Sequence, residues 1–182
     1  GISIWFCNME RKNAWLSYNE ADEKALEKLA KDYRTFLDNG KTERECVSEL
    51  SREAEAVGYV SLDKKLASGE KIQTGDKIYA VGMKKIMALF YIGEDPMEKG
   101  MNILGAHIDS PRLDVKQNPL YEDTDLAYLD THYYGGVKKY HWVALPLAIH
   151  GVIVKKDGTV VNVTVGEDED DPVVYITDLL IH

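Results

Sequence analysis

The sequence predicts a mixed α/β fold, because two amphipathic helical segments near the start are followed by a series of strand-like runs. The helical segments cover residues 19–38 and 42–57, and β-rich runs begin at residue 77. No long helical pattern occurs after about residue 116, so the second half should be β-rich. We therefore expect a domain boundary at residues 115–120 and divide the chain into 1–116 and 117–182.

Both helices have recognisable starts or ends. The first carries apolar side chains at helical spacing, and Asn39-Gly40 is a stop signal. Those side chains are Leu26, Leu29, Tyr33 and Phe36 or Leu37. The second opens with Thr42 and has Glu45 three residues later, the pattern of a capping box, and ends at Gly58. Its apolar stripe is Val47, Leu50, Ala54 and Val57. Both helices are interpreted as packing elements without chemistry.

The strand-like runs alternate with turn signals. In the first half they cover residues 77–81, 86–92 and 101–108. In the second half they cover residues 145–154, 159–165 and 173–176. Lys155-Lys156-Asp157-Gly158 separates two of these runs and predicts a β-hairpin.

The most informative segment covers residues 105–116, where the sequence reads GAHIDSPRLDVK. His107 and Asp109 lie at the end of the expected strand, and residues two apart in an extended segment point to one face. An imidazole is a good zinc ligand, and a nearby carboxylate can fix its tautomer or reach the metal itself. Position, spacing and chemistry agree on a metal site, but one His-x-Asp supplies too few ligands, and such a pair taken alone is more often ordinary structure.

Other polar clusters are weaker candidates. The acidic run at residues 167–171 lacks the glycine and distal glutamate of a calcium loop, which favours a solvated loop. His132 lies among aromatic residues and glycines that permit either a ligand contact or a tight turn. His141 and His150 are interpreted as structural, and His182 alone carries no signal.

Composition and missing motifs argue against several classes of function. The net charge of −9 argues against nucleic acid or an anionic membrane as partner. Two cysteines form no disulfide framework, and neither a membrane-length apolar run nor a signal peptide is visible, so we expect a cytoplasmic protein. No serine-hydrolase elbow, phosphate loop or dinucleotide fingerprint occurs.

Three motifs in order resemble the M18 metallo-aminopeptidases, the family of aspartyl aminopeptidase and vacuolar aminopeptidase I. They are GAHIDSPRLDVK at residues 105–116, Tyr-Gly-Gly at 134–136 and Leu-Leu-Ile-His at 179–182. The resemblance covers essentially the whole chain but less than half of a family member. It implies part of a two-metal zinc-peptidase catalytic domain, followed by a β-rich dimerisation domain inserted into it.

The resemblance also implies roles for individual residues. His107 corresponds to a ligand of a two-zinc site, in which Co²⁺ or Mn²⁺ could replace zinc, and Asp109 orients His107. His182 corresponds to a histidine that reaches the partner subunit's active site and assists substrate binding or the transition state. Family members assemble as tetrahedral dodecamers built from dimers.

The resemblance implies a zinc-dependent aminopeptidase that removes N-terminal residues from peptides. The general base and the remaining ligands correspond to positions beyond residue 182, and the sequence contains no Glu-Glu pair, so we expect an inactive portion of a longer enzyme. Residues 136–142 differ from the stretch typical of aspartyl enzymes and leave the preferred N-terminal residue open. Two alternatives stay open: another two-metal hydrolase of the same clan, and a non-catalytic β-rich assembly module.

Overall fold

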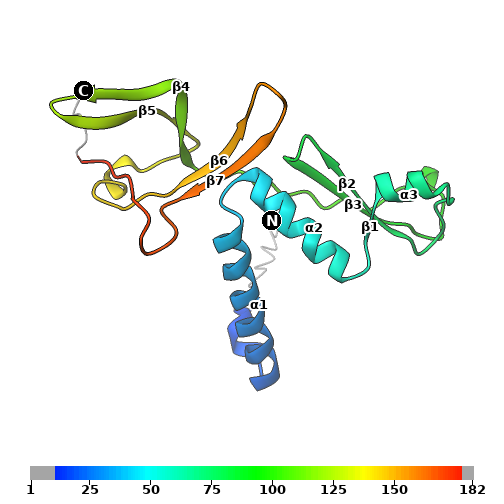
Figure 1. Cartoon of the computed structure of the whole chain (residues 1–182). Helices are drawn as coiled ribbons and strands as arrows, with labels where there is room; N and C mark the ends of the chain where they lie inside the picture. The colour runs from blue at the N-terminus through cyan, green and yellow to red at the C-terminus, as the bar shows by residue number, and fades with distance from the viewer. Residues whose placement is uncertain (1–10, 178–182) are drawn as a thin grey trace, which may run out of the picture. The chain divides into compact units, whose positions relative to one another are not determined.

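The computed structural model describes residues 11–177 and divides after Asp38 into two compact units (Figure 1). The first unit contains the short 3₁₀ helix η1 (Ala14–Ser17) and most of α1 (Glu20–Asn39). Asn19 caps α1, because its side-chain oxygen accepts hydrogen bonds from the backbone N–H groups of Ala21 and Asp22. The predicted first helix is therefore confirmed. Among residues 11–177, no helix combines the length and apolarity needed to cross a membrane.

The second unit begins with a helix packed on a small sheet. It comprises α2 (Glu43–Ala56), β1 (Val60–Ser61), α3 (Leu62–Ser68), β2 (Lys77–Gly82) and β3 (Ile86–Tyr91). The strand order is β1-β2-β3, with β1 parallel and β3 antiparallel to β2. The buried core lies where α2 meets β2 and consists of Cys46, Val47, Ala54, Ile78 and Tyr79.

A local signal explains the start of α2, and positive φ angles shape the turn after β2. The capping box is present, since Thr42 Oγ1 accepts from the Glu45 N–H while the Glu45 carboxylate accepts from the Thr42 N–H. Met83 and Lys84 both adopt positive φ angles, of 51° and 58°, in the turn that joins β2 to β3. The second helix and this strand pair are confirmed.

A long hairpin follows that the strand patterns did not predict. It pairs β4 (Arg112–Asp123) with β5 (Leu126–Tyr134), and Thr124 and Asp125 form the turn with positive φ. The pairing register shifts between Val115 and Leu120, which accommodates a proline that cannot donate to a regular ladder. β4 runs continuously through residues 116 and 117, where a domain boundary is expected; that boundary stays a prediction.

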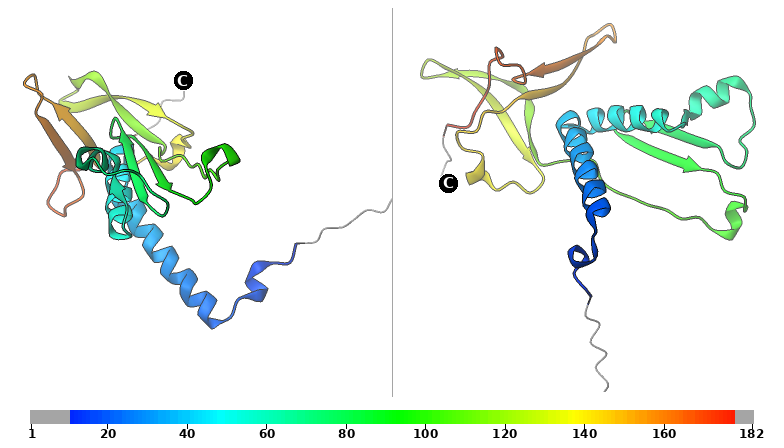
Figure 2. Two further views of the ribbon diagram at one scale, coloured as in Figure 1. Left: turned by 90° about the vertical axis from the view of Figure 1, so that its right-hand side faces the viewer. Right: turned by 90° about the horizontal axis from the view of Figure 1, so that it is seen from below.

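The second hairpin was predicted from its turn. β6 (Ile149–Val154) pairs with β7 (Val160–Val165) around the Asp-Gly turn (Figure 2). β6 begins later than expected, because Leu147 pairs with Val174 in an isolated bridge instead of with β7. The expected strand at 173–176 is reduced to two such bridges. Two further 3₁₀ turns are η2 (Met97–Lys99) and η3 (Lys139–His141).

The prediction of a strand at residues 101–108 is wrong. Residues 100–111 form no strand, and the side chains of Ile103 and Leu104 are 79% and 100% exposed. A strand needs a neighbour that pairs with its backbone N–H and C=O groups, and no strand within residues 11–177 pairs with this segment. An apolar run indicates a tendency to form a strand, but it does not show that a neighbouring strand is available to pair with it and bury it.

Candidate functional site

The side chains of His107 and Asp109 converge as predicted, although residues 107–109 are not part of a strand. His107 Nδ1 lies 3.0 Å from the carbonyl oxygen of Asp109 and 3.2 Å from its Oδ1. Both neighbours are acceptors, so Nδ1 carries the proton, and the Nε2 position faces away from this contact. The side chain of His107 is 84% exposed. A histidine whose Nδ1–H is fixed by a carboxylate has the usual arrangement of a metal ligand that binds through Nε2.

Tyr134, at the end of β5, holds the other oxygen of Asp109. Its hydroxyl donates a 2.9 Å hydrogen bond to Oδ2. This bond, together with the Asp109 backbone N–H and the nearby His107, lowers the pKa of the Asp109 carboxyl group. The same bond raises the pKa of the Tyr134 hydroxyl, which stays protonated and can donate. The carboxylate is thus bound on both oxygens.

Arg112 links this pair to α2. Its guanidinium carbon lies 4.1 Å from the centre of the Tyr134 ring, a cation–π contact. Nε donates to Asp114 Oδ1 at 2.8 Å, and Nη1 donates to Glu43 Oε1 at 3.0 Å. Because Glu43 lies in the first turn of α2, one arginine joins the helix start to the open end of the β4–β5 hairpin.

Cys46 and Gly135 lie next to the segment that carries His107 and Asp109. The buried Cys46 thiol of α2 lies 3.7 Å from the carbonyl oxygen of Ile108 and 3.2 Å from that of Gly40. Burial, with smaller contributions from nearby glutamates, raises the pKa of Cys46, which keeps the thiol protonated as a donor. Gly135 has φ +78°, and a Cβ there would lie 3.4 Å from Pro111 Cα. The contact distance is ordinary, so it is the left-handed φ that favours glycine at this turn beside Asp109.

A second polar cluster joins β6 and the loop after β7 to the start of α2. His150 Nδ1 lies 2.7 Å from Glu45 Oε1, and its Nε2 lies 2.6 Å from Glu167 Oε1. Burial lowers the pKa of His150, but the hydrogen bonds and charges of the two glutamates together outweigh it, so the net pKa is raised. The His150 hydrogen bond in turn lowers the pKa of Glu167. His150 is therefore a structural histidine, as expected.

The other candidates make local contacts only. His132 pairs with Asp114 across the β4–β5 hairpin, and its ring stacks on Tyr133 at 5.4 Å. His141 meets Tyr140 edge-on at 4.2 Å. Asp171 closes the acidic loop by accepting from the Gly166 N–H at 2.8 Å, which explains that loop without a cation.

The described residues supply only part of a metal centre. Between residues 11 and 177 no group of three or more His, Cys, Asp or Glu side chains could hold a metal ion. His182, expected to act across a dimer, lies outside the described residues. Tyr134 and Arg112 were not recognised as site residues from the sequence, although the Tyr-Gly-Gly motif pointed to the first of them. His107 and Asp109 together suit one metal ligand, the imidazole, and the carboxylate that orients it.

Comparison with known proteins identifies the family. A family model described as aminopeptidase I zinc metalloprotease (M18) matches residues 36–182. The chain belongs to the M18 aminopeptidase family. This M18 chain is 59% identical over 173 residues to a probable M18 family aminopeptidase 1 of Clostridium acetobutylicum, and 44% identical over 174 residues to one of Thermotoga maritima. These matches cover 95% and 96% of the chain.

Solved structures agree with the fold of this M18 chain. Aminopeptidase I from Borrelia burgdorferi B31 superimposes with a TM-score of 0.85 at 37% identity, covering 93% of this chain and 41% of the other. Aminopeptidase I from Clostridium acetobutylicum gives 0.78 at 59% identity, covering 94% and 38%. The mixed helix–strand fold is thus confirmed. The M18 chain spans 37% of the length of the curated relatives it matches.

Proposed function

We propose that this chain forms part of a zinc-dependent aminopeptidase that removes N-terminal residues from peptides. The observation that carries the proposal is the contact of His107 Nδ1 with Asp109, 3.0 Å to the carbonyl and 3.2 Å to Oδ1, in a chain of the M18 family. That contact leaves Nε2 as the free ligand atom of an exposed imidazole. The family description names zinc, and Co²⁺ or Mn²⁺ would suit the same ligand.

Each residue of the site would have a defined part. His107 would hold one of two zinc ions through Nε2, and Asp109 would fix the ring and its tautomer. When bound, zinc polarises the scissile carbonyl and lowers the pKa of an attacking water. His182 would act in the partner subunit's active site, within a dimer-based assembly such as a dodecamer. The remaining ligands and the general base would come from outside this sequence.

The proposal includes an arrangement in two domains. Residues 1–116 would form part of the catalytic domain, and residues 117–182 part of an inserted β-rich dimerisation domain. The position of β5, β6 and β7 after residue 117 supports a β-rich second part, whereas β4 crosses the division. We place the whole protein in the cytoplasm, because two cysteines and an acidic composition are ordinary for that compartment.

A non-catalytic assembly module is the second candidate. It is favoured by one observation, that residues 11–177 hold no cluster of three potential metal ligands. In that case the His107–Asp109 contact is structural, and replacing His107 alters stability without altering any activity.

The test is amino-acid release from a panel of aminoacyl anilides by the complete gene product. We expect release that chelation abolishes and that added Zn²⁺, Co²⁺ or Mn²⁺ restores, and the panel would name the preferred residue. His107→Ala should lose release and retain less metal. His141→Ala is the matched control, since His141 is exposed and contacts Tyr140 only edge-on. Absence of release with every metal would leave the assembly module as the function.

A further inference from the structure

We propose that Tyr134 is a positioning residue for the metal site: its hydroxyl fixes Asp109, and Arg112 fixes the Tyr134 ring against α2. This inference rests on the proposed role of His107 as a metal ligand. It assigns a task to the Tyr-Gly-Gly motif beyond allowing a tight turn.

The first step concerns what holds the His107 segment in place. Residues 100–111 take part in no strand ladder, so backbone pairing does not fix the positions of His107 and Asp109. Side-chain contacts must fix them instead. Those contacts come from α2 through Cys46 and from β5 through Tyr134.

The second step concerns the orientation of the carboxylate. Asp109 Oδ1 faces His107 Nδ1, and Oδ2 accepts from the Tyr134 hydroxyl. With one partner on each oxygen, the carboxylate cannot rotate without breaking one of the two bonds. A phenyl ring at position 134 would leave Oδ2 free, and Asp109 could turn away from the imidazole.

The third step concerns the anchoring of Tyr134 itself. Tyr134 and Arg112 are paired residues at the open end of the β4–β5 hairpin. The guanidinium lies over the ring at 4.1 Å and binds Asp114 on its own strand and Glu43 on α2. The side chains of Arg112 and Glu43 are only 28% and 18% exposed, which favours a fixed geometry over a fluctuating surface pair. A continuous set of contacts thus runs from α2 to His107.

The test compares Tyr134→Phe with the wild-type complete gene product. Phenylalanine keeps the ring that Arg112 covers, so the variant should fold. Two readouts are made: the rate of Zn²⁺ loss to a chelator, and the imidazole ¹⁵N signals of His107 in histidine-labelled protein. Replacing a residue that supports a ligand typically costs about 10–100-fold in metal affinity, and we expect about 10-fold faster zinc loss because Tyr134 acts through Asp109.

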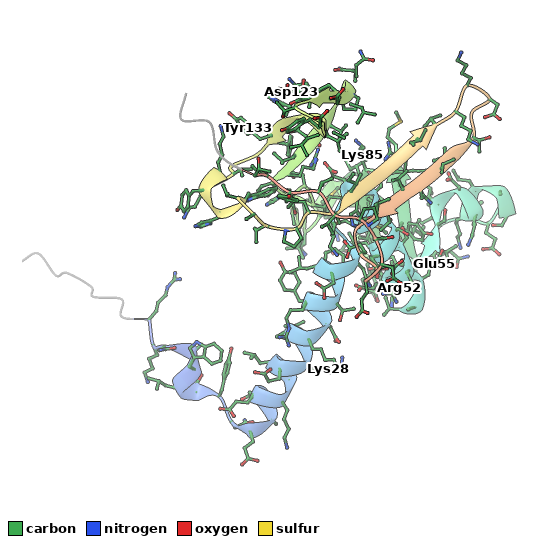
Figure 3. All side chains as sticks on the ribbon, turned by 60° about the vertical axis from the view of Figure 1, so that its left-hand side comes forward. Lys28, Arg52, Glu55, Lys85, Asp123 and Tyr133 are labelled. Carbon is green, nitrogen blue, oxygen red and sulfur yellow. The ribbon has the colours of Figure 1, made fainter. Side chains whose placement is uncertain are left out.

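Tyr133→Phe is the matched control. Tyr133, which is labelled in Figure 3, is the neighbouring residue on β5. Its ring contacts His132 and Lys139. The Tyr133→Phe variant should retain zinc as the wild type does. The His150 signals report on the fold and should be unchanged in both variants. Excess Zn²⁺ should restore kcat of Tyr134→Phe, which it would not do for a variant that had merely lost its fold.

The outcomes separate this inference from the proposed function. Faster zinc loss with shifted His107 signals supports positioning by Tyr134, even if no aminoacyl anilide is cleaved, in which case only the aminopeptidase proposal fails. Zinc retention and His107 signals equal to those of the wild type overturn the inference, whatever the activity.

Discussion

Replacing His150 with leucine removes a charged group that joins β6 to the start of α2 and to the loop after β7. The protonated imidazole donates to Glu45 at 2.7 Å and to Glu167 at 2.6 Å. A neutral imidazole can donate from only one nitrogen, and the lone pair on the other nitrogen would then face a carboxylate. Deprotonation should therefore break one of the two contacts, and leucine should break both.

The size of the effect follows from the two bonds and their exposure. A hydrogen bond to a charged group contributes about 1.5–3 kcal/mol to stability. The His150 side chain is 12% exposed, but those of Glu45 and Glu167 are 29% and 37% exposed, so water compensates part of the loss. We expect His150→Leu to lower the free energy of unfolding by about 2 kcal/mol, or Tm by about 4–8 °C for a chain of this size.

The effect should depend on pH with a defined sign. The folded pKa of His150 is raised, so its stabilisation is complete below the unfolded value of about 6.5 and is lost as pH rises through the folded pKa. The folded pKa of Glu167 is lowered, so its stabilisation is present above the unfolded value of about 4.3 and is lost as pH falls through the folded pKa. The difference between wild type and variant should be largest between these two unfolded values.

Thermal unfolding followed by circular dichroism from pH 4 to 9 measures this difference. His141→Leu serves as control, because it replaces an exposed histidine and leaves His150, Glu45 and Glu167 in place, so its stability should follow that of the wild type. A wild-type-minus-variant difference that stays constant across the range would refute the charged bridge.

Three further changes test the framework around the site. Thr42→Ala removes the oxygen that accepts from the Glu45 N–H and should cost about 1 kcal/mol in urea unfolding; an unchanged midpoint would contradict the capping box. Gly135→Ala places a side chain at φ +78° against Pro111 and should destabilise by about 1–2 kcal/mol by calorimetry, whereas a neutral result would mean that the turn relaxes freely. Tyr79→Phe removes a 2.7 Å hydrogen bond to Glu55 and should cost about 1 kcal/mol by guanidinium unfolding; a gain in stability would argue against that bond.

Local sequence signals were sufficient where a single segment determines its own structure. The Thr42–Glu45 capping box and the Asp157-Gly158 turn each act over a few residues, and both were predicted correctly. The same holds for the convergence of His107 and Asp109, since two residues separated by one neighbour need only an extended backbone.

Features that depend on distant partners were missed. The turn of the β4–β5 hairpin contains Thr124 and Asp125 without glycine, and Pro119 interrupts the strand pattern at the register shift, so no local signal marks the pairing. The contacts of Arg112 with Glu43 and Tyr134 depend on that pairing and could not be read from spacing. The run at 101–108 has strand-like composition, yet composition does not specify a neighbour.

The exposure of Ile103 and Leu104 has a practical consequence for handling the chain. Met101, Ile103 and Leu104 present apolar side chains to water on a backbone segment without ladder partners. Short apolar segments with free backbone groups readily pair with copies of themselves. Preparations of these 182 residues alone should therefore self-associate as concentration rises, and a lysine in place of Leu104 should delay that association in light scattering.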